Sequence, residues 1–181
     1  GVSAAATFQG FLQSGTGAVT RTWNSKAADF IDARDFGVTA DGSTDDTAAL
    51  RLAYAAAKGQ VLVLPAGVIK VSSVPGTPAL TIDAAQAITI IGQGRWSGNG
   101  ESLCTVIRDF GTGITIYCDG TGNSDRRIVL RDFTVRGNAS SLDGISWLLV
   151  SQGLLENVGV IQCGHDGVVF ARCFGSKINN S

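Results

Sequence analysis

The sequence predicts an all-β fold, a parallel β-helix (a solenoid of short strands) capped by one short N-terminal α-helix and preceded by an extended or helical neck. Three observations predict it. From Gln60 onward, apolar residues alternate in bursts of mostly four to six residues, such as QVLVL and RIVLR, between Gly, Asp, Asn or Ser. No helical period interrupts the bursts, which excludes a β-α-β architecture. Parts of them also repeat at intervals near 24 residues, as stacked supersecondary units do.

The composition suits one folded domain with neutral or weakly charged partners. Of the 181 residues, 44% are hydrophobic and 16% are charged, which excludes a disordered chain. Fourteen Lys and Arg against 15 Asp and Glu leave a net charge of -1, unlike a nucleic-acid-binding protein. No apolar run approaches the roughly 20 residues of a membrane helix, so we expect no membrane insertion. Because the chain contains no methionine, we expect it to be a piece of a longer protein.

Residues 1–34 are predicted to form a lead-in and a neck. Residues 1 to about 20 are small and polar and show no sustained period. After them, the apolar residues follow the spacing of one helical face, and Asn24 or Ser25 is available as a cap. These apolar residues are Trp23, Ala27, Phe30 and Ile31. The spacing predicts a short amphipathic helix.

Residues 35–59 are predicted to form a capping segment with a helix at about 45–58. Thr44 or Asp45 can cap its N-terminus, where the paired Asp of TDDT also suits the helix dipole, and Gly59 suits its C-terminal end. One face of the helix carries the apolar residues Leu50, Ala53, Tyr54 and Ala57. Because this face must cover something, we expect the helix to lie across the open first coil of the solenoid.

Residues 60–181 are interpreted as the first coils of the solenoid, truncated within a further coil. LRDFTVRGN at 130–138 aligns with LENVGVIQC at 155–163, and DGISW at 143–147 aligns with DGVVF at 166–170. The offsets of 25 and 23 residues predict about five coils, with apolar side chains inward and Arg131, Thr134 and Arg136 outward. The expected stacked pairs are Leu130 with Leu155, Phe133 with Val158, and Val135 with Val160. A β-sandwich or jelly roll is the competing fold, but it predicts no fixed offset.

The stretch from DFGVTADGSTDDTAALRLAYAAA to VLVLPAGVIKVSS resembles the start of pectin-lyase-like right-handed β-helices. The resemblance rests on Asp35-Phe36-Gly37, Asp41-Gly42, Thr44-Asp45-Asp46-Thr47 and Leu64-Pro65-Ala66-Gly67, whereas Ala40 replaces a common glycine. The preceding FLQSGTGAVTRTWNSKAADFIDARDFG is similar to the neck of bacteriophage tailspikes and tail fibres. Together these matches cover about residues 11–75.

The resemblance implies the N-terminal portion of a homotrimeric tailspike in the virion tail. Such a protein recognises and often degrades a bacterial surface polysaccharide, a capsule or O-antigen. It would contact other tail or baseplate proteins through a region that precedes this chain. We expect no cofactor and no polysaccharide cleavage by residues 1–181 alone. The alternatives are a non-catalytic trimeric receptor-binding or structural segment and, less favoured, a secreted pectinase-like lyase.

Carboxylates at two corners are the candidate catalytic residues. Glycoside hydrolysis needs two carboxylates about 5–10 Å apart. Asp143 and Asp166 would stack one coil apart, yet both precede glycine at a corner, where Asp also serves turns. Glu156 and Asp132 are neighbouring candidates with no stronger claim. His165, the only histidine, lies in the CGHDG corner and is either a solvated turn residue or a general base.

The loop GQGRWSGNGES at 92–102 is the candidate substrate-binding element. Its Trp96 could stack on a sugar ring or pack against a neighbouring subunit, and Arg95 precedes it. The strand region shows no acidic cluster with calcium-ligand spacing. Metal binding is not favoured, because free cysteines commonly serve as small core residues. The residues that could form such a site are Cys163, His165, Asp166 and Cys173.

Overall fold

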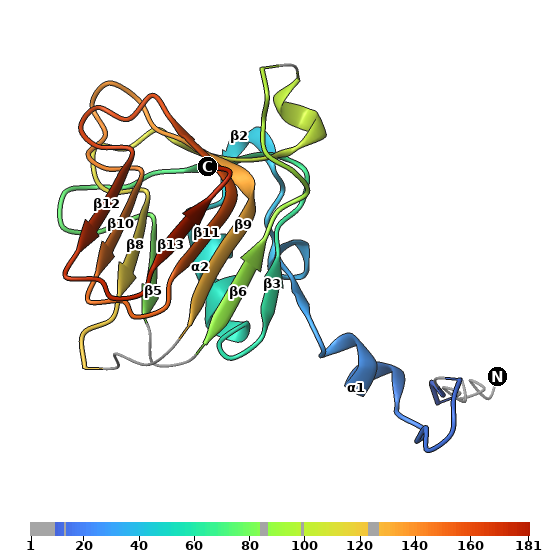
Figure 1. Cartoon of the computed structure of the whole chain (residues 1–181). Coiled ribbons are helices and arrows are strands. Elements are labelled where there is room, and N and C mark those ends of the chain that lie inside the picture. The colour runs from blue at the N-terminus through green and yellow to red at the C-terminus, as the bar shows by residue number, and fades with distance from the viewer. Residues whose placement is uncertain (1–9, 13, 84–86, 99, 123–126) are drawn as a thin grey trace.

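The computed structural model describes residues 10–12, 14–83, 87–98, 100–122 and 127–181, and this part of the chain is built mostly of strands (Figure 1). The strands form one nine-stranded and one four-stranded sheet. Every pairing between named strands is parallel. The predicted all-β, parallel-stranded class is therefore confirmed, and the antiparallel sandwich or jelly roll is excluded.

The strands stand in three columns of stacked parallel strands. The long strands β9 and β11 each belong to two of these columns, the first and the second. The first column contains β1 (Ile31–Asp32), β3 (Val61–Val63), β6 (Ile88–Ile91), the first part of β9 (Ile128–Arg136), the first part of β11 (Leu154–Ile161) and β13 (Lys177–Asn179). The second contains β2 (Asp41–Asp45), β4 (Gly67–Val71), β7 (Thr105–Asp109) and the second parts of β9 and β11. The third contains β5 (Leu80–Asp83), β8 (Ile116–Asp119), β10 (Ile145–Leu148) and β12 (Val168–Ala171).

The chain visits the columns in a constant order, so each round returns it to the strand beside its starting point. The predicted pairs Leu130 with Leu155, Phe133 with Val158, and Val135 with Val160 are in register, as are the two corner motifs. The first-column register runs through Leu62, Ile90, Leu130, Leu155 and Ile178, with spacings of 28, 40, 25 and 23 residues. The interval near 24 therefore holds only for the last rounds, because longer connections enlarge the earlier ones.

The core lies between the columns and consists of ladders, that is, stacks of equivalent buried side chains from successive strands. Equivalent apolar side chains of successive strands lie on top of one another and are at most 1% exposed. The first column supplies Leu62, Ile90, Leu130 and Leu155; the second supplies Ile69, Ile107 and Val135; and the third supplies Ile82, Cys118 and Trp147. Close packing of this kind makes the interior sensitive to the loss of any one side chain.

The corner between the first and second columns is also a ladder. Asp132, Asn157 and Asn180 occupy equivalent places in three rounds, with φ angles of 61°, 51° and 52°. Asn and Asp tolerate this left-handed region better than most residues. The side-chain amide of Asn157 donates to the Asp132 carboxylate at 2.9 Å. Asp132 therefore acts as a corner residue in this structure.

Helix α2 (Thr47–Ala56) lies against the free edge of β5, where the strand of a preceding round would stand. Arg51 donates to the carbonyl oxygens of Pro78 and Ala79, and the Tyr54 hydroxyl accepts from the Asp83 amide at 2.8 Å. The predicted apolar stripe is buried, with no member more than 6% exposed: Leu50, Ala53, Tyr54 and Ala57. The helix thus covers backbone edge and apolar core together.

The start of α2 differs from the expected cap. The residue before the helix is Asp46, and its side chain turns inward to accept hydrogen bonds from Thr39 and from the Ala40 amide. Asp45 instead accepts from the Thr47 amide and hydroxyl. The paired aspartates therefore fix the incoming loop as well as the first turn. The helix ends at Ala56, before Gly59 as expected.

The neck projects away from the three columns in Figure 1, and its helix is shorter than predicted. Helix α1 is Trp23–Ala27 with Thr22 as its cap, whereas Ile31 already pairs with Leu62 in the first column. The chain becomes a strand there because its amides gain a sheet partner, which overrides helical spacing. The part of the predicted lead-in at residues 1–9 lies outside the described residues.

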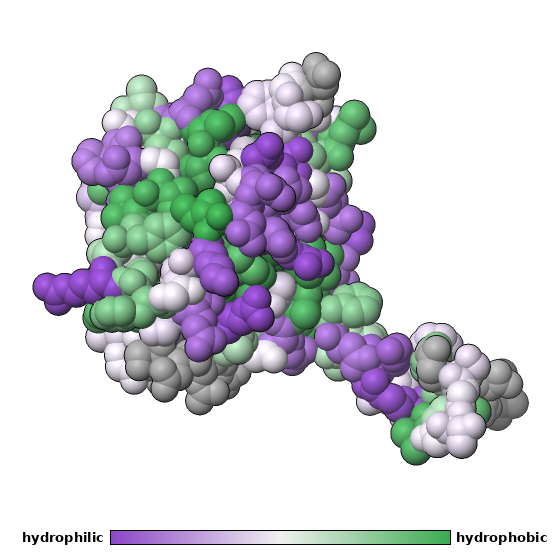
Figure 2. All heavy atoms as spheres, viewed as in Figure 1, coloured by the Kyte–Doolittle hydropathy of each residue, from purple (hydrophilic) through white to green (hydrophobic). Residues whose placement is uncertain are grey.

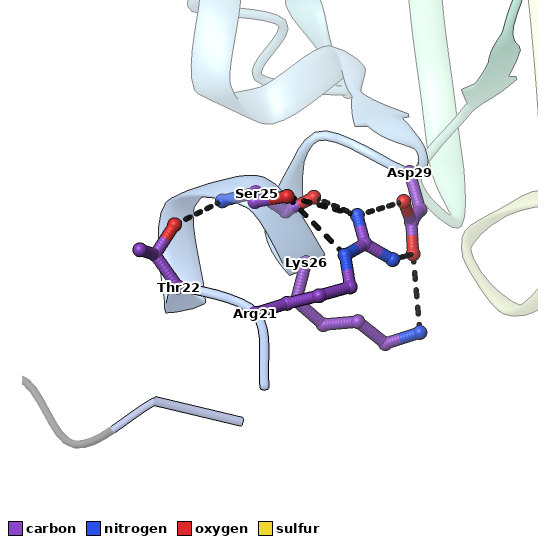
Figure 3. Close-up of polar contacts among 5 residues, drawn as sticks. All are labelled: Arg21, Thr22, Ser25, Lys26 and Asp29. Atoms are coloured by element: carbon purple, nitrogen blue, oxygen red, sulfur yellow. Dashed lines mark hydrogen bonds and ion pairs between the residues drawn. The ribbon is translucent and has the colours of Figure 1, made fainter. Parts of the chain in front are cut away.

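An ion-pair network holds the neck helix (Figure 3). Arg21 forks onto the Asp29 carboxylate and also contacts Ser25, while Lys26 reaches Asp29 at 3.1 Å. Hydrogen bonds from Arg21 and Lys26 lower the pKa of Asp29 to about 2. Phe11 packs edge-on against Trp23, with ring centroids 5.3 Å apart. These contacts give the neck its own local structure.

The short 3-10 helices Ala33–Phe36 (η1) and Glu101–Leu103 (η2) complete the secondary structure of the described residues. Hydrophilic residues lie over the region of β9, β11 and β13, and hydrophobic ones gather toward β12 (Figure 2). None of the helices in the described segments is long and apolar enough to cross a membrane.

Leu155→Ala should lower the free energy of unfolding by about 2–5 kcal/mol, because it opens a cavity in the first-column ladder. Chemical denaturation of the purified chain measures the change. The matched control is Leu103→Ala, since Leu103 is 80% exposed and should lose less than about 0.5 kcal/mol. Equal, small losses for the two variants would contradict the ladder.

Candidate functional site

Three polar side chains meet at the corner before the third column. Asp143 precedes β10, and His165 with Asp166 precedes β12, so the register of these two strands brings the corners together. The Nδ1 atom of His165 lies 2.8 Å from an Asp143 oxygen and 3.2 Å from an Asp166 oxygen. The two predicted carboxylates are therefore neighbours, as the repeat requires, and the imidazole joins them.

The corner is tight at Gly144, the glycine that follows Asp143. A side-chain carbon at Gly144 would come within 2.4 Å of Val160 and 2.8 Å of the Gly167 carbonyl oxygen. Asp143 also accepts a hydrogen bond from the Asp166 amide at 3.3 Å. Its side chain is only 14% exposed, against 60% for Asp166. Asp143 thus connects successive corners, which is the turn role weighed from the sequence.

The electrostatics of the corner favour the charged form of the imidazole. The hydrogen bond to Asp143, and then the charge of Asp166, raise the pKa of His165 above its ordinary value of 6.5. The three ligand-type atoms lie within 4.8 Å of one another. This spacing is shorter than the roughly 6.5–9.5 Å between the carboxyl groups of an inverting glycosidase and close to the roughly 5–5.5 Å of a retaining one. The imidazole contacts both carboxylates, so the corner is not a free carboxylate pair.

The metal site considered from the sequence is not assembled. Cys163 and Cys173 direct their sulfur atoms to the carbonyl oxygens of Ile161 and Trp147, at 3.7 and 3.6 Å. Among the described residues, Asp143, His165 and Asp166 are the group whose ligand atoms converge. Two carboxylates and an imidazole are ligand types that divalent cations accept.

A second group of side chains lies on the outer face of the second column. Lys70, Arg108 and Arg136 are in register on β4, β7 and β9. The Phe110 ring lies beside them, with the Arg108 guanidinium 4.9 Å and the Lys70 ammonium 5.2 Å from its centroid. Phe110 remains 48% exposed. Cation–aromatic contacts therefore hold a solvent-facing ring next to a row of positive charge.

The loop that contains Arg95 and Trp96 folds back over this face. The Trp96 amide donates to the Thr134 hydroxyl at 2.9 Å, and the Trp96 ring lies 5.6 Å from the Arg136 guanidinium. Arg95 donates to the Asn180 carbonyl at 3.0 Å. The loop also buries Thr134, which points outward as predicted but is 1% exposed. Both candidate binding residues thus have partners within their own chain.

The same loop places one carboxylate among the cations. Glu101 pairs directly with Arg136 and lies 3.9 Å from Arg108. Arg136 also donates to the Gln162 side chain at 2.6 Å. The sequence predicts that Arg136 points outward, but it gives no link between Arg136 and Glu101, Arg108 or Gln162. The register of the second column is the signal that aligns Arg108 with Arg136.

A pocket of about 410 Å³ opens beside these side chains, within the size range of small-ligand sites. It is lined by Arg108, Asp109, Phe110, Arg136, Gly137, Asn138, Ala139, Gln162 and Cys163. Its floor is fixed, because the buried Asp109 carboxylate accepts from the amides of Ser73 and Gly111 and from the Thr115 hydroxyl. We call this cavity the arginine pocket.

We call the group Asp143, His165 and Asp166 the histidine corner. It shares two turns with the arginine pocket, residues 137–143 and 162–166. The Gly164 amide donates to the Ser141 hydroxyl across them. Burial, and less strongly the charges of Asp143 and Asp109, raise the pKa of the Cys163 thiol. Glu156 lies apart on the first column, in register with Arg131.

Comparisons with known proteins give fold likeness but no family. Neither a protein-family profile nor a curated protein matches the chain. ORF18 of Geobacillus virus E2 has a similar structure, with a TM-score of 0.63 and 17% identity over 85% of this chain. The chain covers 33% of that protein, so it spans about a third of its length. The Agl-KA catalytic domain, at a TM-score of 0.42, 17% identity, 93% of this chain and 39% of that one, supports no inference.

Titration of His165 by NMR tests the corner, because His165 is the only histidine in the chain. We expect a pKa above 6.5 that falls markedly in Asp143→Asn, which removes the main hydrogen bond, and less in Asp166→Asn. Because the folded-state pKa is raised, the stabilisation is present below the unfolded pKa and is lost as pH rises through the folded value. An unchanged pKa in Asp143→Asn would show that the imidazole does not bind this carboxylate in solution.

Proposed function

We propose that this chain is the N-terminal portion of a phage tailspike that binds a bacterial surface polysaccharide, a capsule or O-antigen. The observation that carries the proposal is the arginine pocket, where the exposed Phe110 ring adjoins guanidinium and amide donors on a rigid sheet. An aromatic ring offers a flat apolar surface to a sugar, and fixed donors orient its polar groups. In this proposal the protein is part of the virion tail.

The proposed architecture is a right-handed parallel β-helix with α2 as its N-terminal cap. It is supported by the three columns, by their constant order, and by the strong preference of parallel crossovers for the right hand. The structure is also similar to that of a phage protein. The sequence resemblance of residues 11–75 to tailspike necks and β-helix starts supplies the link to phage.

We propose that the chain binds polysaccharide without cleaving it. Both carboxylates of the histidine corner contact the His165 ring, and Asp143 is mostly buried. Neither carboxylate is therefore free to act as a nucleophile while a separate group acts as the general acid. In this proposal, degradation belongs to other parts of the tailspike, and no cofactor or metal takes part in binding.

Binding to a panel of purified capsular polysaccharides and O-antigens, by biolayer interferometry, tests this function. At least one polymer should bind, and Phe110→Ala should weaken its binding roughly tenfold, as loss of a buried aromatic contact does. Phe174→Ala is the matched control, because Phe174 is an exposed aromatic residue outside the pocket. The same mixtures should release no new reducing ends or unsaturated products.

Absence of binding across the panel would contradict the polysaccharide-binding function. Equal effects of the Phe110 and Phe174 variants would remove the arginine pocket as its location. Product release that is lost in Asp143→Ala or Asp166→Ala would instead assign catalysis to the histidine corner.

We further propose a homotrimer joined through the neck, whose remote end faces other tail or baseplate proteins. Trp23 and Phe30 are 48% and 54% exposed, and α1 has only five residues. So short a helix needs a partner surface, and exposed aromatic residues suit one. A groove of about 540 Å³ between the neck and the first column is lined partly by Asp29, Gln60 and Arg127.

Light scattering coupled to size exclusion should give a trimer at micromolar concentration. The double change Trp23→Ser and Phe30→Ser should give a monomer, because it removes the apolar contacts of the neck. Leu103→Ser, at a still more exposed position, should leave the trimer intact. A monomeric unsubstituted chain would contradict assembly through the neck.

A further inference from the structure

The charge of the arginine pocket comes from one face of the second column. Lys70, Arg108 and Arg136 extend from equivalent positions of adjacent strands, which are about 4.8 Å apart in a sheet. Three positive side chains therefore line up on this face, and two of them, Arg108 and Arg136, line the cavity. Such an alignment costs electrostatic energy unless carboxylates balance it.

Carboxylates of the chain balance this row incompletely. Lys70 is in register with Asp45 and donates to the Ser43 carbonyl at 3.0 Å. The remaining two cations, Arg108 and Arg136, share the single carboxylate of Glu101. Arg108 reaches it only at 3.9 Å, beyond hydrogen-bond distance, and keeps 38% of its side chain exposed. One positive charge at the pocket thus lacks a close counter-charge among the described side chains.

The other acids nearby are already engaged. Asp109 accepts hydrogen bonds from the turn below the pocket, and Asp143 accepts from His165. Their charge is directed to backbone amides and the imidazole rather than to the arginines. The guanidinium of Arg108 is therefore the group most available to an incoming anion.

We propose that the arginine pocket selects acidic polysaccharides and binds a sugar carboxylate between Arg108 and Arg136, where it displaces Glu101. This inference rests on the proposed polysaccharide-binding function and names the substrate class. The pair already accommodates a carboxylate from Glu101, so a carboxylate is the anion whose shape the site fits. A guanidinium presents its donors in a planar fork that matches this group.

Glu101 acts in this proposal as a tethered competitor. It lies in η2 on a surface loop rather than in a column, so its side chain can leave the arginines without disturbing the ladders. Its carboxylate occupies Arg136 until a uronic-acid-type sugar replaces it. Phe110, against Arg108, then lies beside the sugar ring that carries the carboxylate.

The first experiment compares a uronic-acid-containing capsular polysaccharide with the same polymer after chemical reduction of its carboxylates to alcohols. The acidic polymer should bind the full chain, and the reduced polymer should bind at least roughly tenfold more weakly, since a charge-assisted contact is lost. Equal binding of both forms would overturn the carboxylate inference while leaving polysaccharide binding intact. Binding of neither acidic nor neutral polymers would instead remove the proposed function. Equal binding of a sulfated polymer of matched charge would overturn the preference for carboxylate.

The second experiment assigns the contact to residues. Arg108→Gln should weaken binding of the acidic polymer roughly tenfold or more, whereas Glu101→Gln should strengthen it severalfold because the competitor is gone. Arg34→Gln is the control, since Arg34 is an exposed arginine that pairs with Asp32 beside the first column. A gain of affinity in Glu101→Gln has no explanation in misfolding. Unchanged affinity in both pocket variants would overturn the proposal.

Discussion

In-register stacking of parallel strands is the constraint on which the rest of this structure depends. Each round places its apolar side chains on those of the previous round, so one register fixes the core, the corners and the outer faces together. The ladder from Leu62 to Leu155 buries the interior, and the same register aligns Lys70, Arg108 and Arg136 outside. It also brings Asp143 beside Asp166. The register that stacks apolar side chains for packing therefore also brings like charges together on the outer face. These charges must be balanced by nearby counter-charges or used for binding.

The ends of such a stack have no further round to pair with, and the N-terminal end shows how the chain meets this problem. Helix α2 occupies the place of a third-column strand, and Arg51 with Tyr54 makes the hydrogen bonds that a neighbouring backbone would have made. Strands β1 and β2 continue the other two columns. The polar side chains of the helix pair with the strand edge, and its apolar stripe covers the core. A single strand could not do both at a closed end.

The sequence was sufficient to predict what depends on repetition. The offset between Leu130 and Leu155 predicted their contact, and the 3.6-residue period predicted the buried stripe of α2. The contacts that the loop 92–102 makes with the second column depend on no repeat or period, so the sequence pattern did not predict them. Thr134 had the spacing of an exposed residue but lies beneath Trp96, and nothing local linked Glu101 to Arg136. At the corner, the pairing of Asp143 with Asp166 was predictable, whereas the bridging orientation of His165 depended on a turn conformation that sequence spacing does not specify.

The unequal rounds have an evolutionary consequence. A round of 40 residues stands beside one of 25 in the same columns, and both keep the register. The extra length lies in the connections between strands, which include the loop 92–102. Insertion and deletion in such connections can leave the register unchanged, while they change the loops that border the outer face. Selection can exchange such loops between related proteins and so diversify what the surface recognises, with the columns inherited unchanged.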